Sequence, residues 1–135
     1  IHQLNPRIHT AALLDHTTVS FKHQPSLIDG VWTAGMKPEK YQWDYVAMAH
    51  AIGAYCYEPF EEDLTSSMVV RAHQLGMKVV PWHWAENQGS YIDVTLTNHL
   101  IDIGVDGLIV DDLPGTLTLV AQRNLQSSTK PYFHN

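Results

Sequence analysis

Short runs of hydrophobic residues recur along this chain, separated by longer segments in which apolar positions follow helical spacing. The runs have the length expected of buried strands, and the first reads as a strand buried on both faces of a parallel sheet. They cover residues 8–15, 54–57, 78–84 and 107–110. The segments with helical spacing cover residues 43–52, 64–75, 91–103 and 116–125.

The residues that flank these segments support the predicted boundaries. Gly53, Gly76 and Gly104 stand where the first three helices should end, because glycine readily adopts the left-handed conformation of a helix C-terminus. Thr65 is placed to cap the start of the second helix. Residues 16–42 show no sustained period and predict an extended loop that is functional, partner-bound or mobile.

Strands that alternate with helices predict an α/β fold of four parallel βα units joined by right-handed crossovers. Two architectures fit this pattern: an open four-stranded sheet and the second half of a TIM (β/α)8 barrel. A complete barrel needs roughly 250 residues, and this chain has 135, so it could supply only half of one. We therefore expect residues 1–135 to form a single partial domain, completed by another segment or chain, because a half barrel alone leaves two strand edges unpaired.

Composition narrows the class of protein further. The chain is 44% hydrophobic and 16% charged, which is typical of a globular protein. Its net charge of -6 disfavours nucleic acid and anionic membranes as partners, and no apolar run is long enough for a transmembrane helix. The single cysteine, Cys56, is expected to be a buried, inert thiol. A start at Ile1 without methionine suggests a processed precursor or a part of a longer chain, and the compartment stays open.

Several motifs in the stretch from Pro6 to Pro114 resemble the carboxyl-terminal half of the glycerophosphodiester phosphodiesterase family, whose fold is a TIM barrel. The matching motifs are Asn5-Pro6-Arg7-Ile8, Val70-Arg71-Ala72-His73, Gly76-Met77-Lys78-Val79, Pro81-Trp82 and Gly104-Val105-Asp106-Gly107-Leu108-Ile109-Val110-Asp111 with Pro114. The resemblance implies a hydrolase that cleaves a small phosphodiester with a divalent metal, Mg²⁺ or Ca²⁺. It also implies that the catalytic histidines and metal ligands lie in the amino-terminal half of the barrel.

Two departures from the family pattern lie at the expected mouth of the barrel. The family usually continues its tryptophan as Trp-Thr-Val-Asn, whereas this chain reads Trp82-His83-Trp84-Ala85. The family commonly has Thr-Asp-aromatic-Pro where this chain has Asp111-Asp112-Leu113-Pro114.

The family's His-Arg and Glu-x-Asp motifs are absent from this sequence. The acidic run Glu61-Glu62-Asp63 is interpreted instead as charges that favour a helix N-terminus. No catalytic residue and no metal ligand is predicted in this half.

The predicted site residues follow the strands at their carboxyl ends, where α/β barrels bind ligands. Trp82 could pack against the glycerol or alkyl part of a phosphodiester, with core packing as the alternative. His83 and Trp84 share its loop, and His83 could carry a proton or donate to a phosphate. Glu58 and Asp111 are the acids expected to contact a ligand, although Asp111 or its neighbour Asp112 could instead cap the last helix.

Three functions are consistent with these features. The first is the carboxyl-terminal half of a phosphodiesterase that becomes active only when its amino-terminal half is present. The second is a catalytically inactive relative of that family acting as a binding, toxin-like or storage protein, because fold does not fix function. The third is an independent open α/β module that binds a small ligand and needs no partner.

Overall fold

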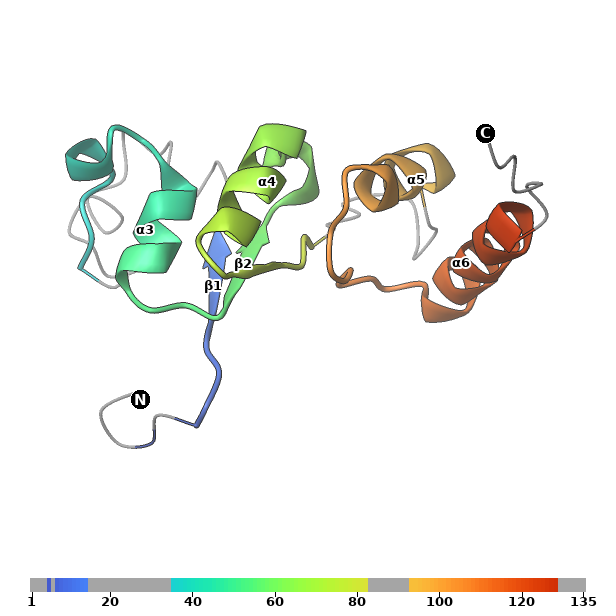
Figure 1. The fold of residues 1–135 in the computed structure, drawn as a ribbon, viewed down its shortest axis with the longest axis horizontal. Coiled ribbons are helices and arrows are strands. Elements are labelled where there is room, and N and C mark those ends of the chain that lie inside the picture. Colours follow the sequence, from blue (N-terminus) through green and yellow to red (C-terminus); the bar gives the residue numbers. More distant parts are fainter. Residues whose placement is uncertain (1–4, 6, 15–34, 83–92, 129–135) are drawn as a thin grey trace, which may run out of the picture.

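The computed structural model describes residues 5, 7–14, 35–82 and 93–128. Within them, three strands form one parallel sheet in the order β1-β2-β3. The strands are β1 (Ala11–Leu14), β2 (Cys56–Pro59) and β3 (Lys78–Val79). The helices are α3 (Tyr45–Ala51), α4 (Ser66–Gln74), α5 (Val94–Asp102) and α6 (Leu113–Ser128), with short 3-10 helices η1 (Pro38–Tyr41) and η2 (Glu61–Asp63) (Figure 1).

The α/β class and the parallel arrangement predicted from the sequence are confirmed, with shifts at the strand boundaries. The second strand begins and ends two residues later than predicted. The third is short, but its path continues as a bridge between Phe60 and Trp82. The predicted fourth strand, 107–110, is reduced to a single parallel bridge between Trp82 and Ile109, so the described sheet has three strands where four were predicted.

Capping residues set the helix boundaries. The Thr65 side chain accepts a hydrogen bond from the amide of Met68, as predicted. The starts of the last two helices differ from the prediction. Asp93 caps α5, which begins at Val94, three residues later than predicted. Asp112 caps α6, which begins at Leu113, three residues earlier than predicted. All three predicted glycine stops are confirmed, since Gly53, Gly76 and Gly104 have φ of 72°, 78° and 87°.

The predicted long loop at 16–42 contains a short helix in its described part. Pro38 occupies the first turn of η1, where its fixed φ suits a helix and its missing amide hydrogen costs nothing. The prediction of an unstructured connection was therefore wrong for Pro38–Tyr41. Residues 15–34 lie outside the described residues.

The core lies between one face of the sheet and the helices α3 and α4, which lie side by side on it (Figure 1). Its strand residues come from alternate positions, as the pleat requires. The buried core residues are Ala12, Leu14, Val46, Ala49, Ala54, Tyr57, Leu64, Val69, Ala72, Met77, Val79 and Leu100.

Cys56 is a buried free thiol, as predicted. Its burial and, to a smaller extent, the nearby Glu58 carboxylate raise the pKa of the thiol to about 11. The thiol therefore stays protonated and unreactive near neutral pH.

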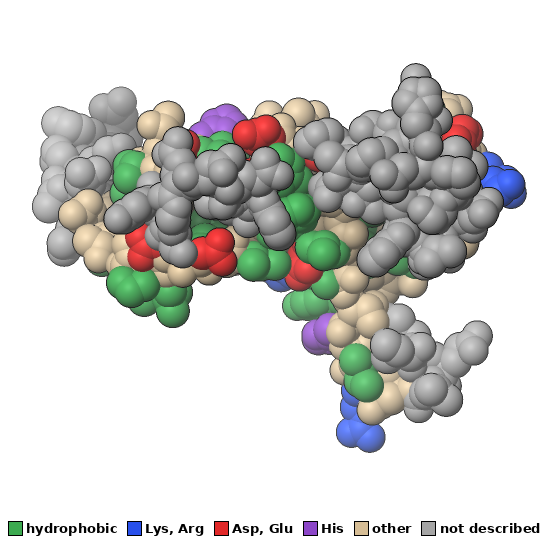
Figure 2. All heavy atoms as spheres, turned by 180° about the vertical axis from the view of Figure 1, so that it is seen from behind, with side chains coloured by type: hydrophobic (Ala, Val, Ile, Leu, Met, Phe, Trp, Pro, Cys, Tyr) green, Lys and Arg blue, Asp and Glu red, His purple; other side chains and the backbone are tan. Residues whose placement is uncertain are grey.

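The opposite face of the sheet is only partly covered. Residues of β1 alternate between exposed and buried, and Leu13 is 59% exposed, so the prediction of a strand buried on both faces was wrong for this structure. The reason is that α3 and α4 both pack on the other side. The view from behind shows hydrophobic and acidic side chains close together among the described residues (Figure 2).

None of the described helices combines the length and the apolar character that would let it cross a membrane.

Candidate functional site

The carboxyl ends of the three strands are tied together by backbone hydrogen bonds just beyond the regular sheet. The amide of Phe60 donates to the carbonyl of Leu14 at 2.8 Å, and the amide of Trp82 donates to that of Pro59 at 3.0 Å. The amide of Glu61 donates back to the carbonyl of Trp82 at 3.1 Å. These bonds hold Phe60, Glu61 and Trp82 at the edge where parallel α/β folds bind ligands.

Trp82 is the central side chain of this edge. Its indole Nε1 donates a hydrogen bond to the carbonyl oxygen of Leu14 at 3.3 Å, so the ring extends from the path of β3 to the end of β1. The ring also lies against Phe60, with ring centroids 5.1 Å apart and planes tilted by 52°. This is a favourable aromatic geometry that fixes the ring orientation. Trp82 therefore stands where the sequence placed it, and its contact with a ligand stays a prediction.

Glu58 lies one residue before the end of β2, whereas the sequence predicted a position just after the strand. It pairs in register with Leu13 of β1 and is half-buried. Its neighbours Tyr57 and Pro59 are buried. Because side chains alternate along a strand, Glu58 belongs to the face of the sheet opposite α3 and α4, which would be the interior of a closed barrel.

The two aspartates before α6 have different roles, which the sequence left open. The Asp112 side chain accepts a hydrogen bond from the amide of Gly115 at 2.9 Å, and its carbonyl accepts from Thr116. Asp112 is therefore the N-cap. Asp111 is exposed and no described partner engages its side chain, so its carboxylate is available to a ligand.

Two of the predicted site residues, His83 and Trp84, lie outside the described residues, so their part of the prediction is untested.

Glu61 is a residue of this edge that the sequence analysis misjudged. It was grouped with Glu62 and Asp63 as a charge that favours the N-terminus of the next helix, but its exposure is only 7%, and the three residues form η2, ahead of the first turn of α4. Glu61 lies two residues after β2, but the strand predicted at 54–57 ended two residues too early to bring it to this edge. A buried carboxylate at this edge is a further candidate for ligand contact.

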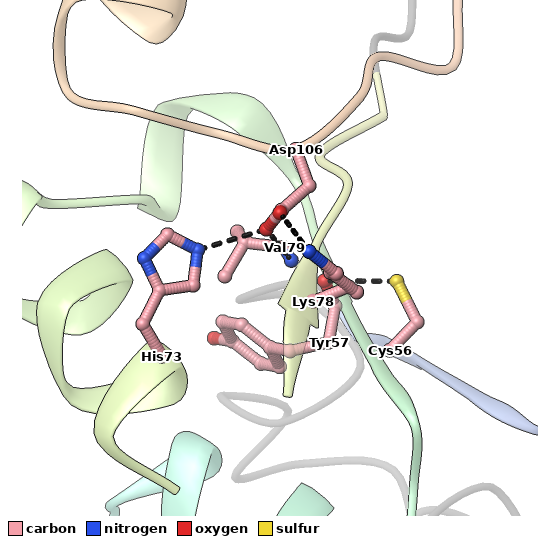
Figure 3. A network of polar contacts seen from close by, with 6 residues as sticks. All are labelled: Cys56, Tyr57, His73, Lys78, Val79 and Asp106. Atoms are coloured by element: carbon pink, nitrogen blue, oxygen red, sulfur yellow. Dashed lines mark hydrogen bonds and ion pairs between the residues drawn. The ribbon is translucent and has the colours of Figure 1, made fainter. Parts of the chain in front are cut away.

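A second polar cluster occupies the opposite edge, at the amino end of β3 (Figure 3). The Asp106 carboxylate accepts hydrogen bonds from His73 Nε2 at 2.8 Å, from Lys78 Nζ at 2.7 Å and from the amide of Val79 at 2.9 Å. Desolvation raises the pKa of Asp106, but the bonds from Lys78, Val79 and His73 outweigh it and lower the pKa to about 2. This cluster joins α4, β3 and the segment after α5, and its place at the amino end indicates a structural role.

The described residues do not fit a metal centre. In residues 5, 7–14, 35–82 and 93–128, no three or more His, Cys, Asp or Glu side chains are grouped so that they could hold a metal ion. The divalent metal implied by the family resemblance therefore has no described site in this chain.

Comparison with known proteins identifies the fold but not the function. No known family profile matches the sequence, and no curated protein matches it. Among the solved structures that match the fold are two proteins provisionally named glycerophosphoryl diester phosphodiesterases. The protein from Silicibacter pomeroyi is 19% identical, with a TM-score of 0.63 over 91% of this chain and 34% of its own. The protein from Agrobacterium tumefaciens is 10% identical, with a TM-score of 0.57 over 92% of this chain and 40% of its own.

These matches agree with the resemblance seen in the sequence. The chain has the fold of one segment of these proteins and spans about a third to two fifths of their length.

Proposed function

We propose that this chain is the carboxyl-terminal half of a phosphodiesterase-like TIM barrel, with four βα units, and that another segment or chain completes it. The proposal rests on the parallel register of β1, β2 and β3 and on the partly uncovered second face of the sheet. Coverage of only 34% and 40% of the two similar structures fits a partial barrel that needs further strands. Those strands would pair beside β1 and beside the segment at Ile109.

In the completed barrel, the function we propose is metal-assisted hydrolysis of a small phosphodiester. The observation that carries this proposal is the convergence of Trp82, Phe60 and Glu61 at the carboxyl edge, with Glu58 on the inner face. Trp82 would form a wall against the alkyl or glycerol part of the substrate, and the free carboxylate of Asp111 would accept hydrogen bonds from its hydroxyl groups. The proton-transferring histidines and the ligands for Mg²⁺ or Ca²⁺ would belong to the completing segment.

A binding protein without catalysis is the second candidate. The altered sequence after Trp82, His83-Trp84-Ala85, favours it, because the change falls in the loop that would border the substrate. Such a protein would keep the aromatic wall at Trp82 and bind a phosphodiester without cleaving it.

The decisive experiment measures turnover and binding in the chain joined to its completing segment. We expect glycerophosphocholine or bis(p-nitrophenyl) phosphate to be hydrolysed, and a chelator to abolish the reaction. Asp111→Asn should lower the rate without lowering the free energy of unfolding, because Asp112 and not Asp111 caps α6. Binding of glycerophosphocholine without turnover would support the non-catalytic alternative, and absence of both would refute the two candidates together.

A further inference from the structure

Two consecutive residues between η1 and α3 adopt a backbone conformation that normally favours glycine. Gln42 has φ of 54° and Trp43 has φ of 64°. The turn is closed by the amide of Trp43, which donates to the carbonyl of Pro38 at 3.0 Å, and by that of Asp44, which donates to Tyr41 at 3.0 Å. A left-handed conformation is uncommon for a bulky residue and costs free energy, so glycine would suit both positions better.

Core packing accounts for only part of the Trp43 side chain. Trp43 is 42% exposed, although tryptophan is among the most hydrophobic side chains of the chain. The strained backbone thus holds a large aromatic ring partly in solvent. Strain of this kind is more often retained at functional positions than elsewhere.

Lys37 and Lys40 belong, with Arg7, to the exposed cations of the described residues that form no ion pair. Arg71, Lys78 and Arg123 each form an ion pair with an aspartate. Lys37 and Lys40 lie on the turn that precedes Trp43. Glu39 is the acid between them, so the turn carries two lysines against one glutamate in a chain whose net charge is -6.

The turn lies at the same end of the strands as the candidate site, the carboxyl end. It precedes α3, which follows β1 in the chain, and a helix of a βα unit starts near the carboxyl end of the preceding strand. Figure 1 shows η1 beside the start of α3, at the end of the molecule away from α6. The turn therefore belongs to the end of the sheet at which the strands have their carboxyl ends.

We propose that Trp43, Lys37 and Lys40 form a contact with the surface of a phospholipid bilayer that contains anionic lipid. Tryptophan is favoured at the membrane interface, where its ring and its indole N–H meet apolar and polar groups together. Lysine stems can lie along the ring while their ammonium groups meet lipid phosphates. The net charge of -6 disfavours an anionic membrane as a partner of the chain as a whole, but salt screens exposed charges beyond about 8 Å. Of the acids next to the turn, Asp44 is paired with Arg71, which leaves Glu39 against the two lysines.

The proposal goes beyond the proposed function and can fail or hold without it, because it is tested by binding and not by turnover. The full chain is sedimented with vesicles of phosphatidylcholine and phosphatidylserine in equal parts. We expect Trp43→Gly to weaken vesicle binding about tenfold. Its free energy of unfolding is measured beside it, because relief of the backbone strain and loss of the buried part of the ring act in opposite directions. Gln42→Gly is the matched control: it relieves similar strain, keeps the ring, and should bind like the parent chain.

A second variant avoids any change to the strained backbone. Replacing both Lys37 and Lys40 by alanine should weaken binding about tenfold or more at low salt, and less at high salt. A parent chain that does not bind the vesicles would overturn the proposal. Equal binding by Trp43→Gly and the parent would also overturn it, since the contact would then lie elsewhere, for example on the uncovered sheet face.

Discussion

The indole nitrogen of Trp82 donates a hydrogen bond to the backbone carbonyl of Leu14, across the end of the strand that lies between them. The bond joins residues 68 positions apart in the sequence and ties the carboxyl end of β1 to the path of β3. Trp82 therefore has a structural role at the same edge where we propose that it meets a ligand. A test of its function must separate the two roles.

Trp82→Phe separates them in part, because phenylalanine keeps an aromatic surface and loses the donor. We expect the free energy of unfolding to fall by about 0.5–1.5 kcal/mol, the net value of one hydrogen bond. Urea unfolding measures this change. Phe60→Leu is the companion variant: it removes the ring contact and leaves the indole bond in place, with an expected loss of similar size. An unchanged stability in Trp82→Phe would contradict the structural role of the indole nitrogen.

The two aspartates before α6 give a second prediction. Asp112→Ala removes the N-cap and should lower the free energy of unfolding by about 1 kcal/mol, whereas Asp111→Ala should change it by less than about 0.5 kcal/mol. Thermal or urea unfolding of both variants under one condition makes the comparison. Equal losses would mean that Asp111 shares the capping role, which would weaken its assignment to a ligand.

The cluster around Asp106 predicts a larger effect at the other edge. Asp106→Asn removes the charge that pairs with Lys78 and weakens the bonds from His73 and from the Val79 amide. We expect a loss of about 1–2 kcal/mol, near the low end for bonds to a charged group because Lys78 and His73 are partly exposed to solvent. Asp111→Asn serves as the control, since its side chain bonds no described residue.

Acid should destabilise the parent chain through this same group. The pKa of Asp106 is lowered from its ordinary value of 3.8 to about 2 because the favourable bonds outweigh desolvation. A lowered folded-state pKa means that the contribution is fully present above pH 3.8 and is lost as the pH falls toward about 2. In Asp106→Asn this part of the acid dependence should disappear. Unfolding curves recorded between pH 5 and pH 2 measure it. If the free energy of unfolding falls with pH as steeply in the variant as in the parent chain, the assignment to Asp106 is contradicted.

Much of the fold could be predicted because its signals are local. Glycine at a helix end and Thr65 at a helix start act through their own backbone or side chain, and both predictions were confirmed. The apolar spacing that predicted a helix over residues 64–75 is equally local, and Val69 and Ala72 of α4 are buried in the core. These features need no knowledge of the rest of the molecule.

The errors came from tertiary contacts that no local pattern reports. The burial of Glu61 depends on the return of the chain at Trp82, whose carbonyl accepts the Glu61 amide hydrogen bond. The exposure of Leu13 depends on which face the helices cover. Asp106 was named from the sequence only as part of a motif, and its carboxylate has its role through His73 and Lys78, which are 33 and 28 positions away.

The account depends most on the claim that this chain is a part of a barrel that another segment completes. Native mass spectrometry of material purified from its source, before and after denaturation, tests it directly. The account predicts that these residues are found either within a longer chain or with a second polypeptide that is released only on denaturation. A folded, stable monomer with the mass of these 135 residues alone, and with rapid hydrogen exchange along the free side of β1, would contradict it.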